Sequence, residues 1–315
     1  MRVFLLRRSL GLVANLFVIS VIVFVTMNVL PGDPAATVLG IDASEEAIEA
    51  LRAEFGLDRP AWQRYGDWVT GLFRGDFGQS YFFRVPVAEL IVERLPLTLS
   101  LAVLGMALTV LAGILLGVVA AARHGRSGDW LIMLFSQIGI AIPAFWLSIL
   151  LVLVFAVWLR WLPPGGFPGW DEPGLALQSL ILPATALALV QSAVLARVTR
   201  SSALEVMGQD YIRTARAKGL SHGRVLRAHV LPNALIPVIT IVGLQVGSVV
   251  TGTIVIENVF YLPGLGRLIF QSIANRDLFV VQGLVLFFAT VVVTANFLVD
   301  VAYVIIDPRL EDRLE

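Results

Sequence analysis

The sequence predicts an all-α polytopic membrane protein with six transmembrane helices. Of its 315 residues, 57% are hydrophobic and only 15% are charged, whereas charged residues make up roughly a quarter of soluble domains. The mean hydropathy is +0.85, and several apolar runs exceed the about 20 residues that span the hydrocarbon core of a bilayer. Because lipid offers the backbone no hydrogen-bond partners, such runs form helices. The composition therefore excludes an ordinary soluble domain.

Six apolar runs account for the predicted spans, and Asp300 is the one ionisable residue deep within them. A signal peptide is the alternative for the first run, because Arg2, Arg7 and Arg8 lie before or at its start. The run is longer than the roughly 7–15 apolar residues of a signal peptide, which favours a retained helix. The expected spans are Leu10–Leu30, Leu97–Ala122, Trp130–Leu159, Leu177–Ala196, Leu235–Ile256 and Phe279–Ile306.

The spans divide the chain into segments, and Lys and Arg set their orientation. Positive charge near the spans gathers at the N-terminus, in the connection that holds Arg123 and Arg126, and in the loop 197–232. Both termini and that loop are therefore predicted to be cytoplasmic. The segments are an N-terminus with the first span (1–30), an extracytoplasmic segment (31–96), a transmembrane domain (97–306) and a cytoplasmic tail (307–315).

The extracytoplasmic segment contains two helical patterns. Ser44 precedes Glu45, Glu46 and Glu49, which is typical of a capped helix N-terminus with acids near its positive dipole end. Further on, aromatic and apolar residues recur at helical spacing and predict an amphipathic helix on the membrane surface. Either a packed external lid or a docking surface for an extracytoplasmic partner fits this pattern. The residues of the second pattern are Trp62, Tyr65, Trp68, Leu72 and Phe73.

A strongly basic stretch, Asp210 to Pro232, lies between the fourth and fifth spans. Its composition predicts a helix over Ser201 to Lys218, a left-handed stop at Gly219, and a second short helix that Ser221 caps. One interpretation is a positive loop against anionic lipid headgroups. The small residues Ala215, Ala217 and Gly219 favour the other interpretation, a helical hairpin against which a partner protein docks closely.

Several polar residues within the spans are candidates for the lining of a path. Hydrogen bonding between helices is the competing explanation for each of them. Asp300 is a functional candidate because a charge at membrane depth is costly, although a helix cap near the cytoplasmic end also fits. Glycines at Gly113, Gly117, Gly243 and Gly247 have the spacing of close helix crossings. The main path candidates are Gln137, Gln191, Gln245, Ser248 and Asp300.

The basic stretch resembles the signature of ABC importer permeases, which reads EAA, three residues, G, nine residues, I, one residue, LP. Gly219, Leu231 and Pro232 stand at the matching positions, as does Ala215 for the second alanine. Arg213, Thr214 and His229 depart from the Glu, first Ala and Ile. This departure is usual in the dipeptide, oligopeptide and nickel branch of the family. The B-type subunit of that branch is similar along almost the whole chain, through the segments LPGDP, FGLDRP, GDFGQS, GLQVG, PGLGR, VVQG and DPR.

The resemblance implies a type I ABC importer permease in a bacterial inner membrane. Its expected partners are a homologous C-type permease subunit, two ABC ATPases, an extracytoplasmic solute-binding protein and membrane lipid, with no nucleic acid. The signature loop would be the coupling helix that the ATPase holds. Alternating access by rigid-body motion is the expected mechanism. The carried-over coupling residues are Thr214, Ala215, Arg216, Ala217, Lys218, Gly219 and Leu220.

The sequence contains no phosphate-binding G-x-x-x-x-G-K-[ST] motif, so we expect no enzyme and no cofactor in this chain. ATP and Mg²⁺ would belong to the partner ATPases. The absence of cysteine excludes disulfides and thiolate metal sites, and three scattered histidines suggest no zinc site.

Other functions and substrates are weighed against a peptide importer. The single intramembrane acid argues against an ion-coupled carrier, and an intramembrane enzyme lacks its motifs. Dipeptides, oligopeptides, a glutathione-like solute and a nickel complex stay open as substrates.

Overall fold

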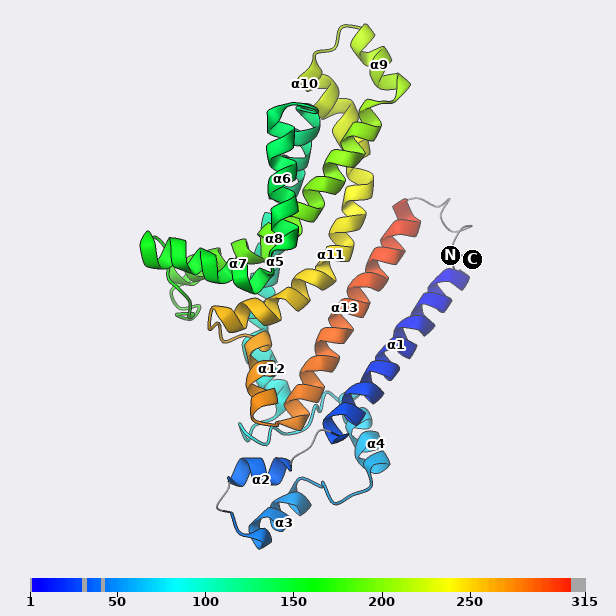
Figure 1. Cartoon of the computed structure of the whole chain (residues 1–315). Helices are drawn as coiled ribbons and strands as arrows, with labels where there is room; N and C mark the ends of the chain where they lie inside the picture. Colours follow the sequence, from blue (N-terminus) through cyan, green and yellow to red (C-terminus); the bar gives the residue numbers. More distant parts are fainter. Residues whose placement is uncertain (1, 30–32, 41–42, 307–315) are drawn as a thin grey trace. The chain divides into compact units, whose positions relative to one another are not determined.

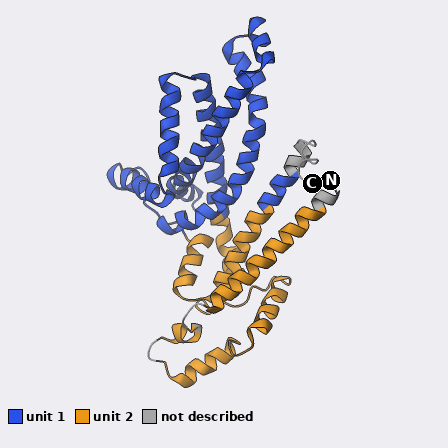
Figure 2. Cartoon of the chain, turned by 45° about the vertical axis from the view of Figure 1, so that its right-hand side comes forward, with its two compact units in different colours: residues 1, 99–262, 295–315 blue, residues 2–98, 263–294 orange. Residues whose placement is uncertain are grey.

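The computed structural model describes residues 2–29, 33–40 and 43–306. The predicted tail 307–315 lies outside the described residues. The chain divides into two compact units (Figure 2). Unit 1 contains residues 99–262 and those from 295 onward, and unit 2 contains residues 2–98 and 263–294. The predicted domain border at 96 and 97 lies near the border of the units, whereas residues 263–294 of the predicted transmembrane domain belong to unit 2.

Every regular element in the described residues is helical, beside one isolated bridge between Gln79 and Pro86. The long helices carry the apolar runs, and short helices lie in the connections (Figure 1). The elements are α1 (Arg2–Val29), α2 (Pro34–Leu39), α3 (Glu45–Glu54), α4 (Ala61–Leu72), α5 (Val87–Ala122), α6 (Ser127–Ala141), α7 (Ala144–Leu151), π-helix η1 (Val152–Trp158), α8 (Pro173–Met207), α9 (Asp210–Ala217), α10 (His222–Val225), π-helix η2 (Leu226–Val230), α11 (Leu231–Val259), α12 (Leu265–Ala274) and α13 (Leu278–Ile306).

Five of these helices are long and apolar enough to cross a membrane, and a sixth span exists if a bent pair counts as one. The bent pair corrects the prediction of one transmembrane helix over Trp130–Leu159. Helix α6 ends at Ala141, and α7 with η1 leaves it at an angle of 109°. Pro143 explains the break, because proline disfavours the helical conformation of the residue before it. Ile142 is accordingly extended, with φ −87° and ψ 126°.

In unit 1, α8 packs against α6, α7 and α11, and much of its surface is buried. The predicted close helix crossings are present at Gly113, Gly117 and Gly243. A Cβ built on Gly113 would lie 2.7 Å from the Leu195 side chain, and one on Gly117 would lie 2.5 Å from Thr199. A Cβ on Gly243 would lie 2.5 Å from Val299. These glycines therefore permit backbone approaches that alanine would obstruct.

Unit 2 contains the extracytoplasmic segment predicted from the sequence. The predicted cap at Ser44 is confirmed, since its Oγ accepts a hydrogen bond from the Ala47 backbone N–H at 3.3 Å. The loop after α4 is held by Asp277, a fully buried carboxylate. Its Oδ2 accepts hydrogen bonds from the Ser80 hydroxyl and from the Phe82 N–H, the latter at 3.1 Å. This loop is thereby fixed to the start of α13.

The aromatic stripe of α4 divides between two surroundings. Tyr65 and Trp68 pack on Phe24 of α1, with ring centroids 5.2 Å and 6.3 Å away, and Trp68 is only 5% exposed. Trp62 and Phe73 remain largely exposed. The inner half of the stripe thus belongs to a packed lid, and only the outer half fits the predicted helix on the membrane surface.

Candidate functional site: a basic hairpin and the helices that leave it

The basic stretch forms a hairpin of α9, α10 and the π-helix η2 between the long helices α8 and α11 (Figure 1). The predicted single helix over Ser201 to Lys218 is wrong in one respect, because α8 ends at Met207 and α9 begins at Asp210. Between them Gln209 is extended, with φ −71° and ψ 149°. Gly208, a poor helix former, stands at this break. The break turns α9 away from the axis of α8.

The turn at the tip of the hairpin forms as predicted. Helix α9 ends at Ala217, and Gly219 has a φ of +83°. Its N–H donates to the Arg216 carbonyl at 2.9 Å, and the Leu220 N–H donates to the Ala215 carbonyl at 3.3 Å. Only glycine adopts this left-handed conformation without strain. A Cβ on Gly219 would meet no atom within 4 Å, so the tip is open.

A small hydrophobic core fixes the hairpin to the rest of unit 1. Ile212, Ala215, Val225 and Val230 of the hairpin bury their side chains against three alanines of α5, α8 and α11. The Ser202 hydroxyl of α8 also donates to the Ala234 carbonyl of α11 at 2.9 Å. The hairpin is therefore packed onto three long helices. Those alanines are Ala121, Ala203 and Ala234.

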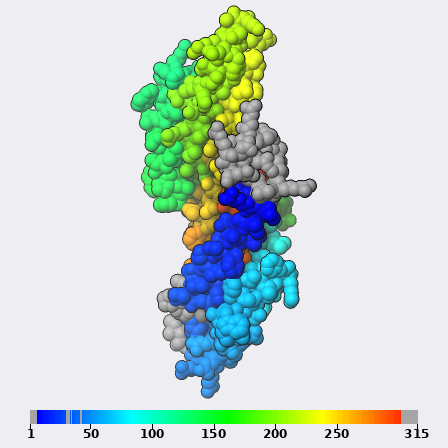
Figure 3. Space-filling model, turned by 90° about the vertical axis from the view of Figure 1, so that its right-hand side faces the viewer, coloured from blue at the N-terminus to red at the C-terminus, as the bar shows by residue number. Residues whose placement is uncertain are grey.

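The outer face of the hairpin carries exposed basic residues, and the hairpin projects at one end of unit 1 (Figure 3). Among the predicted coupling residues, Thr214, Arg216, Ala217, Lys218 and Gly219 are exposed. Ala215, however, is only 9% exposed and Leu220 packs against the same core, so these two residues do not offer a free surface. The exposed basic residues of the hairpin are Arg213, Arg216, Lys218, Arg224 and Arg227, with Arg213 paired to Asp210 at 3.2 Å.

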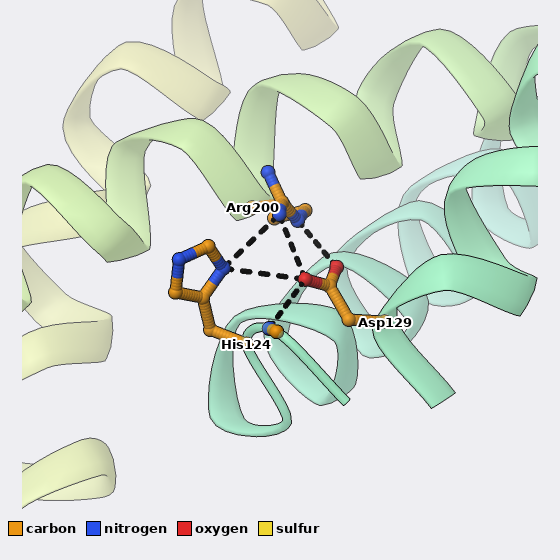
Figure 4. A network of polar contacts seen from close by, with 4 residues as sticks. His124, Asp129 and Arg200 are labelled. Atoms are coloured by element: carbon orange, nitrogen blue, oxygen red, sulfur yellow. Dashed lines mark hydrogen bonds and ion pairs between the residues drawn. The ribbon is translucent and has the colours of Figure 1, made fainter. Parts of the chain in front are cut away.

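A polar network near the hairpin ties α6 to α8 (Figure 4). Arg200 of α8 binds the buried Asp129 carboxylate in a bidentate manner, through Nε to Oδ1 at 2.6 Å and Nη2 to Oδ2 at 2.8 Å. The Gly125 N–H also donates to Oδ2 at 3.0 Å, and His124 Nδ1 lies 3.2 Å from the same oxygen. Such paired, charge-assisted bonds are strong and geometrically specific.

No motif in the sequence predicts this network. Asp129 stands alone beside a basic connection, and Arg200 follows 71 residues later at the end of an apolar run. The isolated acid at the start of a span was the available signal, because an acid there needs a cationic partner.

The structure brings two of the five predicted path residues together. Gln245 of α11 donates from Nε2 to the Gln191 carbonyl at 3.0 Å and approaches Gln191 Oε1 at 3.4 Å. The Gln245 Oε1 is buried and has no hydrogen-bond partner. Gln137 lies instead beside Arg197, with Nη1 to Oε1 at 3.4 Å. Ser248 is exposed on α11, and Asp300 is partly exposed on α13.

Two family models match the chain. The model described as the inner membrane component of binding-protein-dependent transport systems matches residues 113–312. The model described as the N-terminal part of a membrane component of such systems matches residues 1–102. Together they account for nearly the whole chain.

The relatives match along their full length. A putative peptide transport system permease protein of Brucella suis is 46% identical over 311 residues, which cover 98% of this chain and 99% of the relative. The glutathione transport system permease protein of Escherichia coli K12 is 42% identical over 307 residues, with 98% of each chain covered. A solved structure titled as an amino acid ABC transporter with histidines aligns with a TM-score of 0.47 and 19% identity, covering 68% of this chain and 92% of that one.

Proposed function

The chain belongs to the family of inner membrane components of binding-protein-dependent transport systems, the permease subunits of ABC importers, and we propose that it moves di- or oligopeptides across a bacterial cytoplasmic membrane. The observation that carries the substrate class is the 46% identity, over almost the full chain, to a protein named as a peptide transport permease. The 42% identical relative is named for glutathione, which is itself a small peptide. A peptide backbone is the chemistry that these substrates share.

The basic hairpin is the surface on which an ATPase subunit acts. Its exposed residues around Arg216, Lys218 and Gly219 form a cationic tip without steric obstruction. The core beneath it joins the hairpin to α5, α8 and α11. A push on the tip is thus transmitted to three long helices as a rigid-body movement. ATP and Mg²⁺ bind in the partner, and the hairpin of this chain transmits the partner's movement to the membrane helices.

The same arrangement supports the orientation of the chain. Arg123 and Arg126 are exposed in the connection between α5 and α6, and Ala121 just before them packs in the core of the hairpin. Both basic connections therefore lie at one end of unit 1, which the positive-inside rule places in the cytoplasm. Arg2, Arg7 and Arg8 precede the first span, and the same rule predicts that both termini are cytoplasmic.

Peptide movement follows from alternating access between two halves, of which this chain is one and a homologous C-type permease is the other. A solute-binding protein delivers the peptide from outside. The Gln191 and Gln245 side chains of α8 and α11 present neutral amides, which pair with peptide groups without selecting one side chain. The helices that carry these amides are the two that leave the hairpin.

Reconstitution in proteoliposomes tests this function. The full assembly, with partner permease, ATPases and binding protein, should take up a labelled dipeptide only when ATP is supplied on the ATPase side. Uptake that proceeds without ATP and collapses with the proton gradient would instead indicate an ion-coupled carrier. Competition by glutathione and by a nickel chelate at equal concentration ranks the alternative substrates.

The substitution Ala217→Glu tests the hairpin itself. Ala217 is exposed, so the new carboxylate does not disturb the core but places a bulky negative charge beside the tip. Co-purification with the ATPase and peptide uptake should both fall at least about tenfold, as expected when an unpaired charge enters an interface. Ala53→Glu, the same change at an exposed position on α3, should leave ATPase binding unchanged. Equal ATPase binding by both variants would show that the tip of the hairpin is not the surface that binds the ATPase.

A further inference from the structure

Unit 2 contains a pocket of about 220 Å³ on its extracytoplasmic elements. It lies between the ends of α1 and α13, helix α4, the connection after α3 and the loop after α4. Aromatic rings form much of its wall. The Phe55 and Tyr81 rings stack with centroids 3.8 Å apart, and Phe279 meets Tyr81 edge-on at 5.1 Å. Trp68 and Phe24 complete this wall.

The pocket is also lined by Arg64, a half-buried cation that no carboxylate neutralises within the described residues. Its Nη2 donates to the neutral Asn28 Oδ1, and its guanidinium carbon lies 6.0 Å from the centroid of Phe24. Its Nε is buried without any hydrogen-bond partner. The nearby Arg59, in contrast, pairs with Asp67 at 3.6 Å. The Arg64 guanidinium is thus held in place, and no carboxylate among the described residues pairs with it. This arrangement favours an anionic ligand.

Gln282 supplies a second polar group, a side-chain amide, to the same pocket. Its side chain is only 3% exposed and forms no hydrogen bond to any described residue. The Trp68 indole Nε1 is buried without a partner as well. A buried polar group without a partner costs about 1–3 kcal/mol, so Arg64 Nε and Trp68 Nε1 indicate a missing ligand or water beside the Gln282 amide.

The other ionisable groups of the pocket do not satisfy Arg64. Burial raises the pKa of Tyr81, with a further contribution from Asp277, so the phenol stays neutral. Asp76 directs its Oδ1 to the Gly78 N–H at 2.8 Å, and Asp67 is held by Arg59. The pocket therefore combines one available cation, one available amide and an aromatic wall.

We propose that this pocket binds the C-terminal end of a peptide, with the carboxylate on Arg64, the last peptide group on Gln282 and the last side chain on the aromatic wall. The volume of about 220 Å³ is below the roughly 300–1,000 Å³ of sites that enclose whole drug-sized ligands, and it suits one or two residues. The inference rests on the proposed function, because it takes the peptide as the transported solute. It adds an external site that recognises the free carboxylate.

Direct binding to the full-length chain in nanodiscs of zwitterionic lipid tests the proposal. The probes are the dipeptide Ala-Phe and the same dipeptide with an amidated C-terminus, measured by isothermal titration calorimetry. The wild type should bind the acid at least about tenfold more tightly than the amide, because an ion-paired hydrogen bond is lost with the amide. Arg64→Gln should abolish this preference, and Arg64→Lys should retain part of it.

Two further variants separate recognition from folding. Arg59→Gln removes a neighbouring cation that already has a partner, and it should keep the preference for the acid. Gln282→Met keeps the side-chain volume and removes the amide, so it should weaken acid and amide alike while the ratio between them persists. A merely structural role of Arg64 would lower the melting temperature of the Gln variant without changing that ratio.

Several results would overturn the proposal. They are equal affinity for acid and amide, no measurable dipeptide binding at millimolar concentration, or an Arg64-dependent retention of anionic lipid in native mass spectrometry without dipeptide binding. The last result would assign the pocket to a phosphate headgroup. ATP-driven dipeptide uptake by the wild-type assembly is measured separately, so loss of this pocket assignment with intact uptake leaves the proposed function standing.

Discussion

At the scale of single residues, Asp129 and Arg200 form a bidentate ion pair between two helices of unit 1. The Asp129 side chain is 5% exposed and the Arg200 side chain 23% exposed. Removing one partner of such a pair leaves the other charge buried and unpaired. We therefore expect Asp129→Asn to destabilise the fold by about 3 kcal/mol, at the lower end for buried pairs because Arg200 reaches solvent.

The measurement for Asp129→Asn is thermal unfolding of the purified chain, with peptide uptake as the second readout. The double variant Asp129→Asn with Arg200→Gln should recover part of the loss, because neither charge then remains alone. His124→Ala, which removes a 60% exposed side chain, serves as the control with a small effect. Strictly additive losses in the double variant would show that the pair does not act as a unit.

A second prediction at this scale concerns Gly219. Its φ of +83° strains any residue with a Cβ, although the space around it is empty. Gly219→Ala should therefore destabilise the hairpin by about 1 kcal/mol, whereas Gly219→Asn should cost less, because asparagine tolerates the left-handed region. Hydrogen exchange of the amides from Lys218 to Ser221 checks this, and equal exchange in both variants would contradict it.

These residues also show how far local rules reach. Gly219 and Ser44 were predictable, because a helix stop and an N-cap depend on neighbours in the chain. The predicted cap at Ser221 was wrong, since its side chain forms no capping hydrogen bond with α10. The inward direction of Ala215 was not predictable, since it follows from the break at Gly208, which turns α9 so that Ile212 and Ala215 face the core. The contact of Asp129 with Arg200 joins residues 71 positions apart, and nothing in their local sequence specifies it.

At the scale of elements, the bend between α6 and α7 departs most from the predicted helices. Counting apolar residues detects a span but not a bend within it, so Trp130–Leu159 was predicted as one helix. The proline that bends it leaves hydropathy almost unchanged. The break at Gly208 has the same origin, because one residue of low helix propensity hardly alters the average over a window.

The substitution Pro143→Ala tests the cause of the bend. Alanine restores a backbone N–H and relieves the restriction on Ile142, so α6 and α7 should straighten in part. The chain has no cysteine, and spin labels on cysteines introduced at the exposed Leu131 and Val157 report the change. The distance distribution between the labels should broaden and shift to longer distances. An unchanged distribution would show that packing of α7 on α8 sets the angle.

At the scale of the whole molecule, the class, the family and most of the spans were predictable from the sequence. Hydropathy and the positive-inside rule operate on long stretches, so they tolerate errors of several residues. The candidate path was less predictable, because a polar residue in a span can equally well form a hydrogen bond between helices. Gln191 and Gln245 meet across α8 and α11, whereas Gln137 lies beside Arg197.

Gln245→Leu separates a role in the path from a role in stability. It removes a hydrogen bond between α11 and α8, which in membrane proteins contributes about 0.6 kcal/mol on average. We expect a correspondingly small fall in melting temperature but at least about a fivefold fall in dipeptide uptake per ATP hydrolysed, a coupling change of about 1 kcal/mol. The reason is that α8 and α11 both leave the hairpin, so their contact lies between the ATPase and the peptide. Ser192→Ala, which loses only a bond to the Leu189 carbonyl of its own helix at 3.0 Å, should keep the wild-type ratio. If uptake in the Gln245 variant falls only as far as its stability does, the amide is structural and the path must be lined by other residues.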